Sequence, residues 1–431
     1  GLRRFLVVFG ADIQGCKKAL PVVDCGCRRQ QTTHGKDFPH LPRVQQTQKG
    51  FQPMKEYSTS GPKRQEGKTN KRQQSTTKIL WADPDTGEAV ELEPLRDDKF
   101  PWQQRKLKGL DLATLYRTAK LPDKAEKVLS CSTWLQYLAT PDDRRQLHHF
   151  NACKNRLCPI CNKRKAKRMA AQLLKVLDKV QADHKGTQLI FLTLTLRNCE
   201  GDKLRATLDE LTPAWFRLIR RRPFARAVRG WFRAIEITYN EDADTYHPHI
   251  HAILVVENAY FYKNSPLYLT QPTWEKMWRE SLRVNYNPRV DVRSTYGKGG
   301  KTRKAKKERG EVLEAAKYAT KDSDFLNPRM ATEKAAEIVA TYDAALHRKR
   351  LTAMGGWVKE AAAALAVDVE DDSDLVHDTD GEGELTAATA ELLEDYGWHF
   401  GVSQHVLMFR QNNPDYQGGS TDDMDDGPGD A

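Results

Sequence analysis

The sequence predicts an α+β protein in which helices flank an antiparallel sheet, with a small cysteine-rich module before the sheet and disordered termini. Three observations lead to this prediction. Segments rich in β-forming residues alternate with segments of helical periodicity between residues 185 and 330. Four cysteines gather between residues 131 and 161. Both ends of the chain are too poor in apolar residues to fold alone.

The charge of the chain predicts a nucleic acid as its partner. The net charge is +11, but residues 367–431 hold 18 acidic residues against one basic residue, so they carry −17 and residues 1–366 carry +28. Such a basic body suits a polyanion, because each phosphate that it neutralises releases counterions. Solvation of the surface alone rarely needs so large an excess of one sign. No apolar run approaches the ~20 residues that span a bilayer, so we expect a cytoplasmic protein with no membrane partner.

Composition shifts divide the chain into five parts. We expect a disordered basic N-terminal arm at 1–85, a zinc-binding and basic helical module at 100–180, the sheet domain at 185–330, a helical extension at 331–366 and an acidic C-terminal tail at 367–431. Within the tail, residues 385–410 could form a small ordered element. Its opposite charge suggests that the tail masks the basic body when no DNA is bound.

Four of the eight cysteines have the spacing of a zinc site. A structural zinc ion needs four soft ligands in a tetrahedron, and a reducing compartment favours zinc over disulfides. The fourth ligand could be Cys131, although His148 and His149 are alternatives. The helix expected at 163–177 begins with a dense basic run that could lie along a phosphate backbone or simply be solvated. The proposed zinc ligands are Cys131, Cys153, Cys158 and Cys161.

Three strands are expected in the sheet domain, at 188–197, at 230–239 and around the sequence Tyr-His-Pro-His-Ile-His that begins at residue 246. A helix near 204–221 separates the first two strands. The short link at 240–245 predicts a hairpin between the second and third strands.

The third strand carries a candidate metal site. His249 and His251 are two residues apart, so both imidazoles leave the same face of a strand and can share one metal ion. The hairpin would bring Glu236 beside them, and a metal ion would explain an otherwise unpaired carboxylate in an apolar strand. Two alternatives remain: a salt bridge from Glu236 to Arg233 or Arg197, or histidines that bond only to backbone or solvent.

A helix is expected at 311–322, after a basic loop at 298–309 that could grip DNA. On this helix Glu314 lies one turn before Tyr318, so a candidate base lies beside a candidate nucleophile. Lys317 and Lys321 are likewise one turn apart. Without the histidines, Tyr318 would be expected to be a half-buried packing residue.

The motifs at 191–195, 247–251 and 314–322, in this order, resemble the three motifs of rolling-circle replication initiators of small bacterial plasmids. These proteins belong to the HUH endonuclease superfamily, in which U is a hydrophobic residue. The cysteine knuckle and the basic run after it also resemble the segment that precedes those motifs in the family. The resemblance covers about residues 125–330, the acidic tail matches no pattern of the family, and His247 adds a potential extra ligand.

The resemblance implies a ferredoxin-like HUH fold, with the histidines on a central strand and the tyrosine helix packed across that face. His249, His251 and Glu236 would hold Mg²⁺ or Mn²⁺, although such ligands also accept Zn²⁺ or Ni²⁺. Tyr318 would nick one strand of the origin DNA and stay attached to the 5′ phosphate, and Glu314 would activate the water that ends replication after one round. Lys321, or Lys317 less favourably, would stabilise charge.

Two other functions fit the same residues. An HUH relaxase or a transposase of single-stranded elements would use the same chemistry, but Glu314 beside one candidate tyrosine favours an initiator. A zinc-dependent DNA-binding regulator would use the histidines only structurally and leave supercoiled DNA uncut. The expected partners of an initiator are the double-stranded origin and its single-stranded product, with host helicase and polymerase as further candidates; the oligomeric state is left open.

Overall fold

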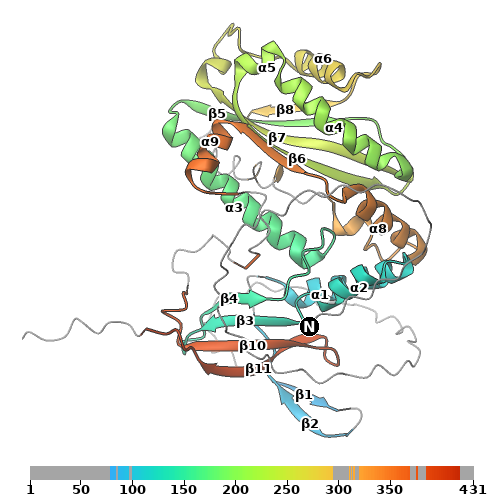
Figure 1. The fold of residues 1–431 in the computed structure, drawn as a ribbon, viewed down its shortest axis with the longest axis vertical. Coiled ribbons are helices and arrows are strands. Elements are labelled where there is room, and N and C mark those ends of the chain that lie inside the picture. Colours follow the sequence, from blue (N-terminus) through green and yellow to red (C-terminus); the bar gives the residue numbers. More distant parts are fainter. Residues whose placement is uncertain are drawn as a thin grey trace, which may run out of the picture. The chain divides into compact units, whose positions relative to one another are not determined.

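The computed structural model of the protein describes residues 78–83, 86–96, 100–294, 310, 312, 314–315, 320–368, 375–376 and 385–417. This part of the chain contains three antiparallel sheets, and helices flank the largest of them, so the predicted α+β class is confirmed (Figure 1). None of the helices described there combines the length and the apolar character needed to cross a membrane. The expected basic loop at 298–309, Lys317 and Tyr318 lie outside the described residues.

A five-stranded sheet carries the histidine segment on its middle strand. Its strands are Thr187–Thr195 (β5), Val228–Asn240 (β6), Thr245–Glu257 (β7), Val290–Ser294 (β8) and Thr352–Gly356 (β9). Their order is β8-β5-β7-β6-β9, and every neighbouring pair is antiparallel. The three expected strands are therefore confirmed, and β6 and β7 form the expected hairpin.

Helices cover both faces of this sheet, because side chains of β7 alternate between two hydrophobic clusters. Ile250 and Leu254 belong to the cluster under α4, α5, α6 and α8, whereas Ile253 and Val255 belong to the cluster under α3 and α9 (Figure 1). Burial on both sides explains why residues 252–256 of this strand are all apolar. The helices are Pro159–Asp183 (α3), Leu204–Ile219 (α4), Arg222–Ala227 (α5), Gln271–Leu282 (α6), Thr332–Leu346 (α8) and Trp357–Ala364 (α9).

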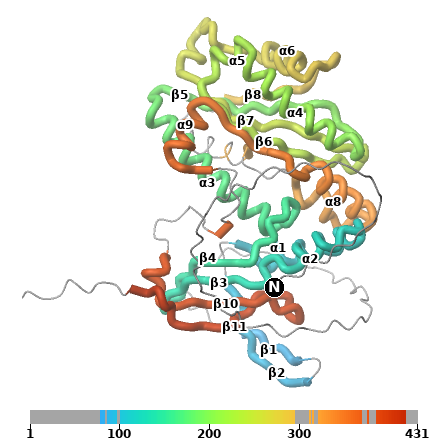
Figure 2. Tube along the Cα trace, in the orientation of Figure 1, coloured from blue at the N-terminus to red at the C-terminus, as the bar shows by residue number. Residues whose placement is uncertain are grey.

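A four-stranded sheet joins the cysteine-rich module to the C-terminal region. Its strands are Trp134–Ala139 (β3), Arg145–Phe150 (β4), Leu392–His399 (β10) and Gln404–Asn412 (β11), in the order β11-β10-β3-β4. Figure 2 shows the red C-terminal strands beside the N-terminal ones. Two helices, Trp102–Thr118 (α1) and Pro122–Ser130 (α2), precede β3.

The acidic C-terminal region is therefore more than a tail. Tyr396 and Val406 are buried, and buried Glu394 accepts hydrogen bonds at 2.7 Å from both Arg145 and Arg410. Two guanidinium groups thus compensate the buried negative charge of Glu394, although the acidic composition of this segment predicts that it is solvated. The small ordered element expected at 385–410 exists, but as half of the module's sheet rather than as part of a separate tail.

Two further expectations about disorder and helix content differ from the structure. Ile79–Ala82 (β1) pairs with Ala89–Leu92 (β2), so ordered structure begins before the expected end of the arm at residue 85. The helical extension contains the edge strand β9, which pairs with β6. Residue propensity does not predict β9, because glycine disfavours strands. At Gly355, however, a Cβ would lie 2.6 Å from the Trp231 ring. Close approach to β6 therefore requires the glycine.

Candidate functional site

Three ligand atoms converge on the face of β7 that α3 and α9 cover. Glu236 on β6 lies directly opposite His249 in the register, and His251 follows two residues later on β7. Glu236 Oε2 is 3.0 Å from His251 Nε2 and 3.5 Å from His249 Nε2, and the two Nε2 atoms are 3.1 Å apart. Adjacent ligands of an octahedral ion at ~2.1 Å lie about 3.0 Å apart, so these three atoms could hold one divalent cation.

The other ring nitrogens of the histidines bind to the protein and turn Nε2 toward this point. His249 Nδ1 lies 3.1 Å from the backbone carbonyl of His247, and His251 Nδ1 lies 3.2 Å from Thr193 Oγ1 on β5. The Phe191 ring stacks on His251, with centroids 5.4 Å apart. A histidine that donates from Nδ1 keeps the Nε2 lone pair free for a metal. The motif at 191–195 therefore orients a ligand of the site.

The electrostatics of the site favour an ionised carboxylate. Burial by itself raises the pKa of the Glu236 carboxyl, but hydrogen bonds and charge attraction from His249 and His251 outweigh it and hold the pKa well below its usual range. Lys321 Nζ lies 3.3 Å from Glu236 Oε1, the oxygen that the imidazoles leave free. Lys321 thus belongs to the site.

The alternative partners expected for these residues are engaged elsewhere. Arg233 donates a hydrogen bond to a backbone carbonyl, and the Arg197 guanidinium lies 4.1 Å from the centre of a tyrosine ring. His247 Nδ1 is 2.7 Å from the Asn198 side-chain oxygen. Within the described residues, the group of three ligands consists of Glu236 and the two later histidines, without His247.

The helix expected to carry the nucleophile covers the same face of the sheet in the part that the structure describes. Val312 and Ala315 are buried in the cluster that contains Phe191, Ala234 and Ile253. Glu314 lies between them and is half-buried. Tyr318 itself lies outside the described residues.

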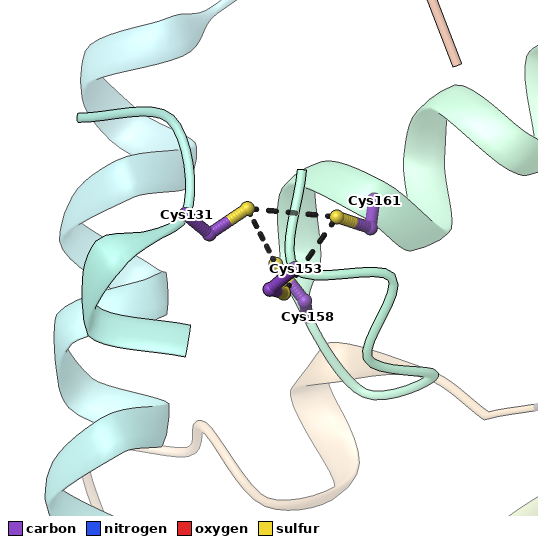
Figure 3. Close-up of side chains that lie close together, drawn as sticks. All are labelled: Cys131, Cys153, Cys158 and Cys161. Carbon is purple, nitrogen blue, oxygen red and sulfur yellow. Dashed lines mark hydrogen bonds between the residues drawn. The ribbon is translucent and has the colours of Figure 1, made fainter. Parts of the chain in front are cut away.

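Four cysteine sulfurs form a second cluster, in the N-terminal module (Figure 3). The sulfur of Cys161 is 3.5 Å from that of Cys131 and 3.7 Å from that of Cys153, and the sulfurs of Cys158 and Cys131 are 3.7 Å apart. Edges of a tetrahedron with Zn–S bonds of ~2.3 Å are about 3.8 Å long, so the cluster could hold a zinc ion. Cys131 is its fourth member, in the position for which His148 and His149 were alternatives.

Local structure favours a thiolate at Cys158, whereas hydrogen bonds from neighbouring thiols, that of Cys131 first, hold the pKa of Cys161 above its usual value. Cys158 is the N-cap of α3 and Cys161 lies in its first turn, where the helix dipole favours negative charge. Hydrogen bonds from neighbouring thiols, that of Cys131 first, hold the pKa of Cys158 well below its usual value. Buried Lys106 donates to the backbone carbonyl of Cys131 at 2.6 Å, and burial lowers the pKa of this lysine to about 8. Lys106 therefore holds in place the ligand that is most distant in sequence.

Sequence reasoning missed Thr193 and Lys106 as parts of these sites. The alternation of Phe191, Thr193 and Thr195 placed them on one face, but nothing in the sequence showed which strand they would face. Lys106 resembles any other surface lysine of an amphipathic helix in the sequence. Only its burial, at 1% exposure, distinguishes it.

Comparisons with known proteins find relatives of this region of the chain. A family described as "Replication protein" matches residues 144–403, which include both sites except Cys131. "Protein rep" of Streptococcus pneumoniae serotype 2 is 33% identical over 291 residues, covering 67% of this chain and 87% of the relative. "Protein rep" of Bacillus amyloliquefaciens is 32% identical over 293 residues, covering 66% and 85%. A "Replication protein" of Staphylococcus aureus is 32% identical over 213 residues, covering 49% and 88%.

No solved structure matches the chain. The family match continues to residue 403, beyond β10, so the expectation that the whole acidic region lies outside the family pattern is wrong. The buried strand β10 explains this, since it completes the sheet of the cysteine-rich module. The matched residues and the similar relatives together confirm the resemblance stated from the motifs: this chain belongs to the replication protein family, the plasmid replication initiators.

Proposed function

We propose that this protein starts rolling-circle replication of a plasmid by nicking and later rejoining one DNA strand at the origin. The observation that carries the proposal is the convergence of Glu236, His249 and His251 on the middle strand of the sheet. Their face is the one that the helix of Val312 and Ala315 covers, as expected for an HUH fold. The basic body of +28 suits the DNA substrate.

The three residues would hold Mg²⁺ or Mn²⁺, and a bound ion would polarise the scissile phosphodiester as a Lewis acid. The carbonyl of His247 accepts from Nδ1 of His249, and Thr193 Oγ1 contacts Nδ1 of His251, so each imidazole is held with Nε2 toward the other ligand atoms. Lys321, which reaches Glu236 from the exposed side, supplies a positive charge where the phosphate oxygens gain negative charge.

Tyr318 is the proposed nucleophile. Ala315 is buried on the histidine face and Lys321 contacts Glu236, so the site has described residues on both sides of position 318. The phenolate oxygen attacks phosphorus, the P–O3′ bond breaks, and the 3′ oxygen takes a proton. The products are a 5′-phosphotyrosine and a 3′-OH that a host polymerase can extend.

We expect Tyr318→Phe to abolish the covalent adduct, because phenylalanine has no oxygen to attack phosphorus. Purified protein is incubated with supercoiled origin plasmid and Mn²⁺, and 5′-linked protein is detected on denaturing gels. The adduct falls by about 10³-fold or more while DNA binding persists. The exposed Tyr262 provides the matched control, since Tyr262→Phe leaves the adduct unchanged.

An adduct that survives in Tyr318→Phe would move the nucleophile to another tyrosine, with Tyr296 the nearest candidate in the sequence. DNA left uncut by the unmodified protein would instead favour a zinc-dependent DNA-binding regulator.

Glu314 is the proposed base of the terminating step. It precedes the proposed nucleophile by four residues, one turn of the helix that the sequence predicts, so its carboxylate could take a proton from a water that attacks the last junction. Nicking itself does not need this base, because the phenolate is the first nucleophile.

Glu314→Ala is therefore expected to nick normally but to fail in termination. In a replication assay the variant gives products longer than one plasmid length, whereas Glu314→Asp gives a partial effect. Products of one plasmid length from Glu314→Ala would remove the base role.

A further inference from the structure

A pocket of about 380 Å³ lies beside the histidine site. Its floor includes Ala234 and Ile235 of β6, the two residues that precede Glu236. Ala234 lies opposite His251 in the strand register, so the floor of the pocket continues the surface that carries the metal ligands. Two strand residues span about 6.6 Å, and this is the distance along β6 from Ala234 to the carboxylate residue.

The walls of the pocket are strongly basic. Six of its sixteen lining residues are basic and none is acidic. Lys349 forms an ion pair with Asp209, and Arg156 donates a hydrogen bond to a backbone carbonyl. Low-dielectric walls of one charge sign attract an anion more strongly than the same charges on an open surface. The basic residues are Lys154, Arg156, Lys165, Arg348, Lys349 and Arg350.

Three segments that are far apart in the sequence build these walls. The first, Lys154 to Leu157, is the loop between two cysteines of the cluster, and Arg156 Nη1 bonds to the carbonyl of Leu346 at the end of α8 at 2.8 Å. The second, residues 348–351, is fixed to β6 because Ile235 N donates to Leu351 O at 2.8 Å. The third is α3, which contributes Lys165.

Two of the basic residues hold unusual backbone conformations. Lys154 and Arg348 both have φ of +54°, in the left-handed region that side chains other than glycine and asparagine rarely adopt. Such conformations persist only where the surrounding structure imposes them, and they gather at binding sites. Both side chains are exposed at the mouth of the pocket.

We infer that this pocket receives one nucleotide of the cleaved strand, next to the scissile phosphate, an inference that rests on the proposed nicking function. The basic residues bind its phosphate, while Met169, Leu351 and Leu375 provide apolar surface for the sugar and base. The volume lies at the small end of the range for ligand pockets, ~300–1,000 Å³, which suits a single nucleotide.

This assignment also gives the cysteine cluster a role in DNA binding. Cys153 and Cys158 flank the loop of Lys154 and Arg156, and Cys161 lines the pocket itself. A closed tetrahedral cluster therefore holds two of the phosphate-binding side chains over the floor that leads to the histidines.

The test compares two double variants of the full-length protein. Lys154→Ala with Arg348→Ala removes two charges from the mouth of the pocket. Lys276→Ala with Arg226→Ala removes the same charges from exposed positions on α6 and α5, which cover the opposite face of the sheet. Binding of a fluorescent oligo-dT is measured by anisotropy across a range of salt concentrations without added Mg²⁺ or Mn²⁺, so that no cleavage occurs.

We expect the pocket variant to bind oligo-dT about 25-fold more weakly at ~0.1 M salt. The slope of its log binding constant against log salt concentration should be less steep by about 1.4, since each lost phosphate contact on a single strand removes ~0.7 from that slope. The matched control stays within about twofold of the unmodified protein. Arg348→Lys retains the slope, because it keeps the charge.

An equal, small change in both double variants would overturn the inference. A second result would also overturn it: the pocket variant loses saturable binding of dTMP or inorganic phosphate, but the salt dependence of its oligo-dT binding is unchanged. The pocket would then bind a free nucleotide or phosphate rather than the strand. Because this measurement does not depend on cleavage, it can contradict the pocket inference in a protein that nicks DNA, or support the inference in a protein that does not.

Discussion

Replacing either His249 or His251 with alanine is expected to lower the proposed metal-dependent nicking by about 10³-fold or more, whereas His247→Ala is expected to stay within about tenfold of the unmodified protein. The three histidines occupy alternate positions on one strand, but only the later two share the ligand group with Glu236. Loss of one imidazole leaves two ligands for an exchangeable cation, and the Lewis-acid stabilisation lost with it is worth several kcal/mol. His247 is instead hydrogen-bonded to Asn198.

The measurement is the initial rate of open-circle formation with Mn²⁺, together with a direct Mn²⁺ titration of each variant. The titration separates loss of the ion from loss of the fold, because all three variants should retain the unfolding temperature of the parent within a few degrees. Equal losses of nicking in all three variants would contradict the assignment of the ligands. Full nicking by His251→Ala would remove the metal centre from this face of the sheet.

Cys158→Ser is expected to have the largest effect on stability. All four cysteine side chains contact the cluster of buried residues that includes Phe100, Trp102 and Tyr396, so loss of a zinc ion would loosen the whole N-terminal module. Structural zinc contributes directly to folding, and a missing ligand costs several kcal/mol of the free energy of unfolding. Removal of the ion with a strong chelator should have the same effect on the parent protein.

Zinc content by elemental analysis and thermal unfolding together test this expectation. Cys199→Ser serves as the control, since Cys199 is half-buried and lies outside the cluster; it should keep the bound zinc and change stability by less than about 1 kcal/mol. A parent protein that binds no zinc, or a Cys158→Ser variant as stable as the parent, would contradict the site.

The central part of the fold could be predicted because its signals are local. The period of two in the histidine strand, the short acidic link after β6 and the apolar alternation of β5 each lie within about ten residues. Such patterns predict the strands, the hairpin and which side chains share one face of a strand, without reference to the rest of the chain. The C-x2-C knuckle is an equally local pattern, and the prediction that it takes part in a metal site rests on it.

The components that depend on distant partners could not be predicted in this way. Glu394 is acidic in an acidic region, and only pairing with Arg145, 249 residues earlier, makes it a buried strand residue. Gly355 disfavours a strand by propensity, and only the Trp231 ring beneath it requires a glycine. Lys106 contacts the cysteine cluster and Arg348 lines the basic pocket because of segments that no sequence period connects to them.

The sequence by itself determined the types of the candidate ligands, their spacing on one strand and a net charge that suits a polyanion, because these follow from residue chemistry and the strand repeat. Only the tertiary structure decided that Cys131 completes the sulfur cluster, that Thr193 orients His251 and that β10 and β11 return to the N-terminal module. These contacts join residues separated by tens to hundreds of positions. Their free energy comes from packing and from compensated buried charge, which local sequence patterns do not encode.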